Sequence, residues 1–130
     1  MKILLFGTFD RFHPGHAYVL REAMKRGDVT VVVARDANVE RIKGRRPRQD
    51  ERERKAAIEE QYPAVTAILG DATDYLAPVR AVQPDLILLG YDQQLPPGLT
   101  EADLNVPVER LFPHEPHKYK SSLRSATRGE

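Results

Sequence analysis

Apolar residues along this chain gather in short continuous runs that alternate with longer, mostly polar segments. β-Branched residues and leucine fill these runs, which is the composition of strands buried on both faces of a parallel sheet. The last run is expected to lie at a sheet edge, because Pro107 cannot donate a hydrogen bond to a neighbouring strand. The runs that predict strands are residues 3–6, 29–34, 65–69, 86–89 and 106–112.

The segments between these strands carry apolar residues at helical spacing. They predict a helix that begins near Pro14 and stops at the turn of residues 26–28, and further helices at residues 49–62, 74–82 and 100–104. The inner face of the second helix is expected to use Ala56, Ala57, Ile58 and Tyr62. Strand, helix and strand follow one another as in a βαβ unit, whose strands are parallel and whose crossover is right-handed. The predicted fold class is therefore α/β: a doubly wound, Rossmann-like parallel sheet of about five strands.

Composition limits the class of protein. The 130 residues are 41% hydrophobic and 30% charged, which is typical of one globular domain, here expected over residues 1–130. The net charge of +1 gives no overall field that would recruit nucleic acid or a membrane. The absence of cysteine excludes a disulfide, a thiol nucleophile and a cysteine metal site. The chain shows no charged-then-apolar leader and no run approaching about 18 apolar residues, so we expect a cytoplasmic protein.

The richest chemistry lies in the turn after the first strand, residues 7–16. Pro14 suits the first turn of a helix, because its φ is already helical and its missing N–H would be unpaired there. His13 and His16 are three residues apart, so they share a face at the helix N-terminus, where free N–H groups and the helix dipole attract anions. Two imidazoles at such a place predict a phosphate site rather than a general acid–base pair. No carboxylate spacing in the turn suggests a metal triad.

Polar segments also follow the second and fourth strands, where open parallel sheets bind ligands. Residues 43–48 form a basic loop. Such charge runs are usually solvated, but a glycine, a proline and the position after a strand favour ligand binding here. Asp92 follows the fourth strand and is expected to contact the ribose or the base of a nucleotide. Near the end of the chain, the hydroxyls of Ser121 and Ser122 are placed to open a last helix and hold a phosphate.

Gly7-Thr8-Phe9-Asp10 followed by His13-Pro14-Gly15-His16 resembles the HxGH nucleotidyltransferases, the cytidylyltransferase-like superfamily. The combination is specific, because a strand-ending GTFD precedes, at a fixed distance, an HxGH that opens a helix. Residues 90–93, Gly-Tyr-Asp-Gln, and residues 118–122, Lys-Tyr-Lys-Ser-Ser, look most like the archaeal FAD synthase branch. The resemblance runs from Lys2 to about Leu123 and thins between residues 94 and 112.

The resemblance implies roles for particular residues. The expected catalytic residues are His13 and His16, which would stabilise the α-phosphate, and Lys43, which would hold the leaving pyrophosphate. The nucleotide-binding residues it implies are Thr8, Phe9, His13, Pro14, Gly15, His16, Arg54, Asp92, Tyr119, Ser121 and Ser122. For Arg54, a surface arginine without a binding role is an equally weighted alternative. A divalent cation, Mg²⁺ first, is expected on the triphosphate, and Asp10 is the nearest acidic residue.

The activity implied by the resemblance is transfer of an adenylyl group from ATP to FMN, which yields FAD and pyrophosphate. The alternative enzyme is a cytidylyltransferase that uses CTP and glycerol-3-phosphate or another alcohol phosphate. The alternative of another class is a non-catalytic nucleotide-binding regulatory module. RNA binding by residues 41–48 is disfavoured, because no aromatic residues are interleaved there for base stacking. The expected partners are therefore a nucleoside triphosphate and a phosphate-bearing acceptor, without nucleic acid or membrane, and a homodimer is compatible with the family.

Overall fold

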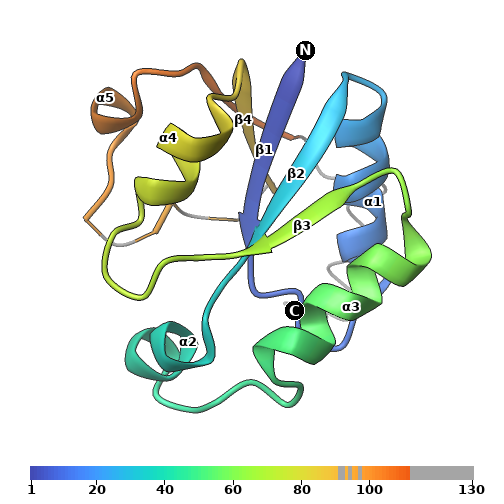
Figure 1. The fold of residues 1–130 in the computed structure, drawn as a ribbon, viewed down its shortest axis with the longest axis vertical. Coiled ribbons are helices and arrows are strands. Elements are labelled where there is room, and N and C mark those ends of the chain that lie inside the picture. Colours follow the sequence, from blue (N-terminus) through green and yellow to red (C-terminus); the bar gives the residue numbers. More distant parts are fainter. Residues whose placement is uncertain (91–92, 94, 97, 112–130) are drawn as a thin grey trace.

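A computed structural model of the chain describes residues 1–90, 93, 95–96 and 98–111. These residues form a five-stranded sheet in which every neighbouring pair of strands is parallel (Figure 1). The strands are β1 (Lys2–Gly7), β2 (Asp28–Val33), β3 (Thr66–Leu69), β4 (Leu86–Leu89) and β5 (Val108–Arg110), in the spatial order β3-β2-β1-β4-β5. The chain therefore starts at the centre, winds outward through β2 and β3, and returns to wind outward on the other side. This is the doubly wound α/β fold that the sequence predicts.

The helices lie on both faces of the sheet, as this topology requires. They are α1 (Pro14–Met24), α2 (Asp36–Lys43), α3 (Glu51–Gln61), α4 (Ala77–Val82) and α5 (Glu101–Leu104). Figure 1 shows α1 and α3 together on one side of the strands and α4 with α5 on the other. The helix α2 follows β2 and lies beyond the carboxyl end of the sheet.

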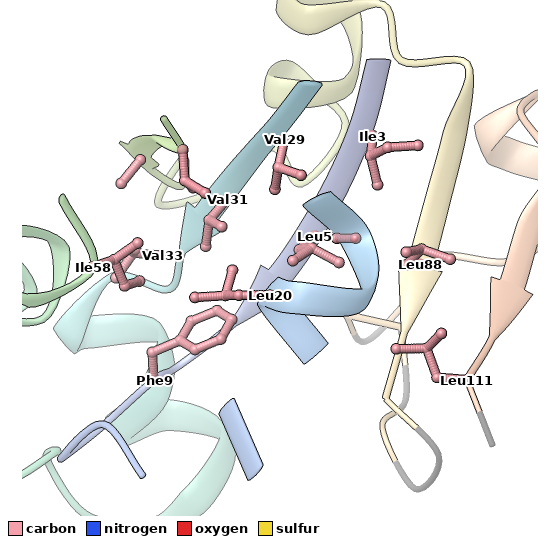
Figure 2. Packing of buried hydrophobic residues seen from close by; sticks show 13 residues of the cluster. Ile3, Leu5, Phe9, Leu20, Val29, Val31, Val33, Ile58, Leu88 and Leu111 are labelled. Carbon is pink, nitrogen blue, oxygen red and sulfur yellow. The ribbon is translucent and has the colours of Figure 1, made fainter. Parts of the chain in front are cut away.

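The core consists of two hydrophobic layers, because successive side chains of a strand point to opposite faces. On the first face, α1 and α3 cover the odd-numbered residues of β1 and β2. Figure 2 shows Leu20 of α1 among Leu5, Val31 and Phe9, with Ile58 of α3 nearby; Leu20 and Ile58 are 0% exposed. The second layer consists of Leu4, Phe6, Val32, Val79, Ile87 and Leu104.

Several element boundaries differ from the prediction. The strand β4 has the predicted bounds, whereas β5 covers only part of the predicted edge strand. The helix α3 begins at Glu51 rather than at residue 49, because Asp50 caps it. The Asp50 carboxylate accepts a hydrogen bond from the N–H of Glu53 at 2.8 Å, and the Glu53 carboxylate accepts one from the N–H of Asp50 at 3.0 Å. This reciprocal capping box satisfies two N–H groups that the first turn would otherwise leave unpaired.

The predicted inner face of α3 is partly wrong. Ala56 is exposed, while Arg54 and Ile58 are both 0% exposed. These two residues are four positions apart and therefore share the face that packs on the sheet. The pattern misleads because it treats a charged residue as a solvated one, whereas this arginine is buried and donates four hydrogen bonds inside the protein.

Candidate functional site

A cavity of about 880 Å³ runs along the carboxyl ends of four strands. Its wall includes residues at or just after the ends of these strands: Gly7, Thr8, Ala34, Gly70 and Gly90. The strand β1 lies at its middle, with β2 paired on one side and β4 on the other, which is the switch point where doubly wound sheets bind ligands. The volume is at the upper end of the roughly 300–1,000 Å³ of small-molecule sites.

The turn after β1 is shaped by an inward-facing phenylalanine. Phe9 has a left-handed backbone, with φ at 54°, and its side chain is buried. Its ring lies against Gly7 so closely that a Cβ atom at Gly7 would come within 2.5 Å of a ring carbon. The same ring meets that of His16 edge-on, with centroids 5.1 Å apart. The packing of the Phe9 ring on Gly7 therefore positions the side chain of His16.

His13 and His16 cap the helix to which they belong. The Nδ1 atom of His13 accepts from the N–H of Gly15 at 3.1 Å, and the Nδ1 atom of His16 accepts from the N–H of His13 at 3.3 Å. The two rings stack with centroids 3.6 Å apart. Because each Nδ1 accepts, each neutral ring carries its proton on Nε2. The cap thus leaves the Nε2–H group of each ring at the N-terminus of α1 without a hydrogen-bond acceptor among the described residues.

The surroundings keep both rings neutral. Burial lowers the pKa of His13 below its ordinary value of 6.5. Burial, followed by the charge of His13, lowers the pKa of His16 to about 4; Lys43 adds to this, and Asp10 opposes it. At neutral pH the pair therefore offers hydrogen-bond donors without full positive charges. Donors fixed in this way stabilise an anion that gains charge during a reaction.

Lys43 reaches the same turn from a different helix. It is the last residue of α2, and its Nζ atom lies 3.5 Å from Thr8 Oγ1. Gly44 ends the helix in a left-handed conformation, with φ at 81°. The expected basic loop therefore begins one residue later than predicted, and Lys43 projects from a helix. Both Lys43 and Thr8 line the cavity.

Arg54 lies outside the cavity wall. Its guanidinium is 0% exposed and donates to the carbonyl oxygens of Thr8 and Ala34, each at 2.8 Å, and of Gln49 at 3.0 Å. It also donates to the Asp36 carboxylate at 2.7 Å. The structure contradicts the alternative of a surface arginine, because the side chain is fully buried, and the nucleotide contact of Arg54 stays a prediction. The side chain ties the turn after β1, the exit of β2 and the start of α3 together.

Asp10 has a structural position of the same kind. Its two carboxylate oxygens accept from the N–H groups of Arg48 and Gln49, at 2.9 and 3.0 Å. Burial raises the pKa of Asp10, but these two hydrogen bonds and nearby arginines lower it by more, so the carboxylate is ionised. Within the described residues, no group of three or more histidine, aspartate or glutamate side chains is placed to hold a metal ion. Asp10 thus anchors the segment before α3, and these residues form no metal cage.

Gln93 contributes to the cavity wall and was not among the predicted site residues. Its side-chain oxygen accepts from the N–H of Gly90 at 3.0 Å, and its side-chain nitrogen donates to the carbonyl of Phe6. Arg110 donates to the carbonyl of Gly90 at 2.9 Å. The two bonds of Gln93 join the ends of β1 and β4 on the cavity wall, and the bond of Arg110 adds β5. The position of Gln93 shortly after a buried strand, next to the expected nucleotide contact at Asp92, could have indicated a site residue.

The other predicted residues divide into two sets. Phe9, Gly15, Thr8 and the two histidines all line the cavity, and Pro14 opens α1 beside them. Asp92, Tyr119, Ser121 and Ser122 lie outside the described residues. Among the residues that are described, no helix is both long and apolar enough to cross a membrane.

Comparison with known proteins gives the family. The family model described as Cytidylyltransferase-like matches residues 4–123. A curated FAD synthase of Aciduliprofundum boonei is 45% identical over 95 residues, covering 72% of this chain and 63% of that protein. One of Methanosphaerula palustris is 44% identical over 103 residues, covering 78% and 66%. A third, of Methanospirillum hungatei, is 35% identical over 128 residues, covering 94% and 81%. The matches thus span just under two thirds of the length of the first two relatives.

Solved structures agree. The lipopolysaccharide core biosynthesis protein of Thermoplasma volcanium has a TM-score of 0.78 at 37% identity, over 88% of this chain and 98% of that one. A protein of Archaeoglobus fulgidus described as of unknown function has a TM-score of 0.60 at 19% identity, over 100% and 98%, and this likeness supports the fold alone. The family resemblance drawn from the GTFD and HxGH motifs is confirmed. The chain belongs to the cytidylyltransferase-like family, and within it is similar to archaeal FAD synthases.

Proposed function

We propose that this protein transfers an adenylyl group from ATP to FMN, producing FAD and pyrophosphate. The observation that carries the chemistry is the neutral, stacked histidine pair, which presents two Nε2–H donors at the N-terminus of α1 inside the cavity. The choice of ATP and FMN is supported by the relatives, which are named FAD synthases. The same histidine arrangement would serve any nucleotidyl transfer, so the substrates rest on the relatives.

The reaction needs positioning and charge stabilisation rather than a base. A phosphate oxygen of FMN attacks the α-phosphorus of ATP in line, the bond from that phosphorus to the β-phosphate oxygen breaks, and pyrophosphate leaves with the electron pair. The attacking group is already an anion, so no proton has to be removed. His13 and His16 donate to the α-phosphate oxygens as their charge grows, and the turn formed by Thr8, Phe9 and Gly15 surrounds them.

Lys43 supplies the cation at the leaving group. Its position across from Thr8 suits the β- and γ-phosphates of a triphosphate whose α-phosphate lies on the histidines. Arg54 acts indirectly, by fixing the carbonyl of Thr8. Asp92 and Tyr119 remain predicted contacts of the nucleoside, and the serine pair at residues 121–122 remains a predicted phosphate contact.

A divalent cation, Mg²⁺ first, is proposed to neutralise the triphosphate. Such ions are commonly bound by one or two carboxylates together with substrate phosphates. The described residues provide no metal cluster, and both oxygens of Asp10 already accept backbone hydrogen bonds. The triphosphate would therefore supply most of the oxygen ligands of such a cation, and Asp10 stays the predicted nearest acidic residue. A single domain over residues 1–130, a cytoplasmic location and a homodimer stay predictions.

A product assay tests the proposal. Purified protein is incubated with Mg²⁺ and either ATP with FMN or CTP with glycerol-3-phosphate, and products are separated while pyrophosphate release is followed. We expect FAD and one equivalent of pyrophosphate from the first pair. CDP-glycerol from the second pair alone would overturn the substrate assignment. Triphosphate binding without pyrophosphate release from either pair would favour a regulatory module.

A further inference from the structure

The cavity has two chemically different parts. The histidine turn and Lys43 supply polar donors near the end of β1, whereas apolar side chains form the wall on the face of the sheet that α4 covers. We call this second part the apolar wall, and it consists of Phe6, Val32, Ile42, Tyr75, Pro78 and Leu95. An apolar surface offers a phosphate group no hydrogen-bond donors. The wall therefore fits another part of a substrate.

Ile42 is the most informative member of the apolar wall. Three large apolar side chains of the described chain are exposed: Met1 at 67%, Met24 at 38% and Ile42 at 50%. Only Ile42 of these three lines the cavity. A single exposed isoleucine needs no explanation, but this one shares a concave surface with Tyr75 and Pro78. An apolar surface gathered in a cavity is what a ligand ring would cover.

A polar cluster holds Tyr75 in place at the edge of this wall. Arg41 donates to the Tyr75 hydroxyl at 2.9 Å and to the Asn38 side-chain oxygen at 2.8 Å. The Asn38 side-chain nitrogen donates to the carbonyl of Asp71 at 3.1 Å, and Asn38 is only 3% exposed. Because the Tyr75 hydroxyl accepts from Arg41, its own proton remains available for a further acceptor. The wall thus combines an apolar surface with one oriented O–H donor.

This combination matches one substrate class. The ring system of FMN is planar, with an apolar methylated side and a side that carries carbonyl oxygens. We propose that the apolar wall binds the ring of the phosphorylated acceptor, with Ile42 and Tyr75 as its specificity-determining residues. The inference rests on the proposed function and deepens it. Glycerol-3-phosphate has no ring to cover this surface, so the wall selects against it.

The neighbouring positions of Ile42 and Lys43 give the inference a geometric basis. Both are in the last turn of α2, and both line the cavity. The isoleucine borders the acceptor ring and the lysine reaches toward Thr8. One helix end therefore serves the acceptor and the triphosphate together.

Steady-state kinetics with separate variation of FMN and ATP tests the wall. For Ile42→Ala we expect the KM for FMN to rise about tenfold, because apolar contact with the ring is lost. For Tyr75→Phe, which keeps the ring and removes the donor, we expect a rise of about fivefold. The KM for ATP should change less than twofold in both variants. Met24→Ala, an exposed apolar side chain away from the cavity, is the matched control and should change neither constant.

A binding measurement separates this inference from the proposed activity. Quenching of FMN fluorescence is titrated with protein alone, so that it reports the wall without turnover. Weaker FMN binding by Ile42→Ala and Tyr75→Phe supports the wall, even if the wild type forms no FAD and the proposed function fails. A higher KM for ATP with unchanged FMN binding would assign the wall to the base and overturn the inference. So would FMN binding that neither variant weakens, or a wild type that does not bind FMN.

Discussion

The turn after β1 and the exit of β2 meet at the same cavity, yet they are held by different means. In the turn, residues that are close in sequence hold one another: His13 and His16 cap their own helix, and Phe9 packs on Gly7. At the exit of β2, the fold depends on Arg54, which reaches back 46 residues to the carbonyl of Thr8. A local motif can lose a chemical group and keep its shape. A long-range tie that loses its central charge leaves several buried groups unpaired.

The largest effect on activity is expected in the local turn. His16→Ala removes an Nε2–H donor and should lower kcat by about 10²–10³-fold, while the fold is retained. His16→Gln is the matched variant, because glutamine at this helix position can still cap the N–H of residue 13. The free energy of unfolding of His16→Gln should be closer to that of wild type than the free energy of His16→Ala is. Its kcat should nevertheless stay low. Turnover within about threefold of wild type in either variant would contradict the role of His16.

The long-range tie is expected to show the opposite pattern. Arg54→Lys keeps the charge but replaces a planar fork by three donors at one point, which cannot reach all four acceptors. We expect a loss of about 2–4 kcal/mol in the free energy of unfolding, measured with urea. Arg52→Lys, on the exposed side of the same helix, should cost less than about 0.5 kcal/mol. Equal stability of the two variants would remove the distinction between the two regions.

A smaller effect is expected where the turn depends on shape alone. A methyl group at Gly7 would lie 2.5 Å from the Phe9 ring, so Gly7→Ala must displace that ring from His16. We expect a loss of about 1–3 kcal/mol in stability and a reduced kcat. Gly70→Ala provides the control for stability, because its added carbon would meet neighbours at 3.4 Å or more. If Gly7→Ala is as stable and active as wild type, the ring does not set the position of His16.

The same contrast explains what could be predicted from the sequence. Strands and helices are visible because apolar periodicity is a local property, and the histidine turn is visible because its residues are consecutive. The position of Arg54 could not be predicted, because its partners Thr8, Ala34 and Asp36 come from two segments that are distant in the sequence. Ala56 was assigned to the core because it is apolar, although it is exposed. A charged residue next to small apolar ones gives no sign that the charge is the buried one.

The apolar wall shows a further limit of sequence analysis. Its members come from β1, β2, α2, α4 and the loops beside them, so no single stretch displays the surface. Ile42 belongs to a mostly polar helix, and Tyr75 lies in the segment 74–82 that the sequence predicts as a helix. The cavity that joins them exists only after the sheet has brought the strand ends together. Local patterns thus predicted the phosphate half of the site and missed the half that we assign to the acceptor.

The smallest expected effect is the dependence of the free energy of unfolding on pH, which differs between the two regions. The pKa of His16 falls from 6.5 to about 4 on folding, first through burial and then through the charge of His13. Between pH 6.5 and 4 the unfolded chain therefore takes up a proton that the folded protein excludes, and stability falls as the pH falls. After allowance for partial exposure, we expect about 1–2 kcal/mol from this ring. Above pH 6.5 the ring is neutral in both states, so none of this stability is lost.

Asp36, at the exit of β2, affects stability in a different pH range. Burial raises the pKa of Asp36, but its hydrogen bonds with Arg54 and Glu51 lower it below the ordinary 3.8, so its contribution is lost only as the pH falls below that value. Urea unfolding of wild type and His16→Gln at pH values from 7 to 4.5 isolates the histidine, because the glutamine does not titrate. The free-energy advantage of wild type should shrink steadily over this range. Parallel pH curves would show that His16 is not held neutral by the fold, and the histidine pair would then act as cations at the α-phosphate.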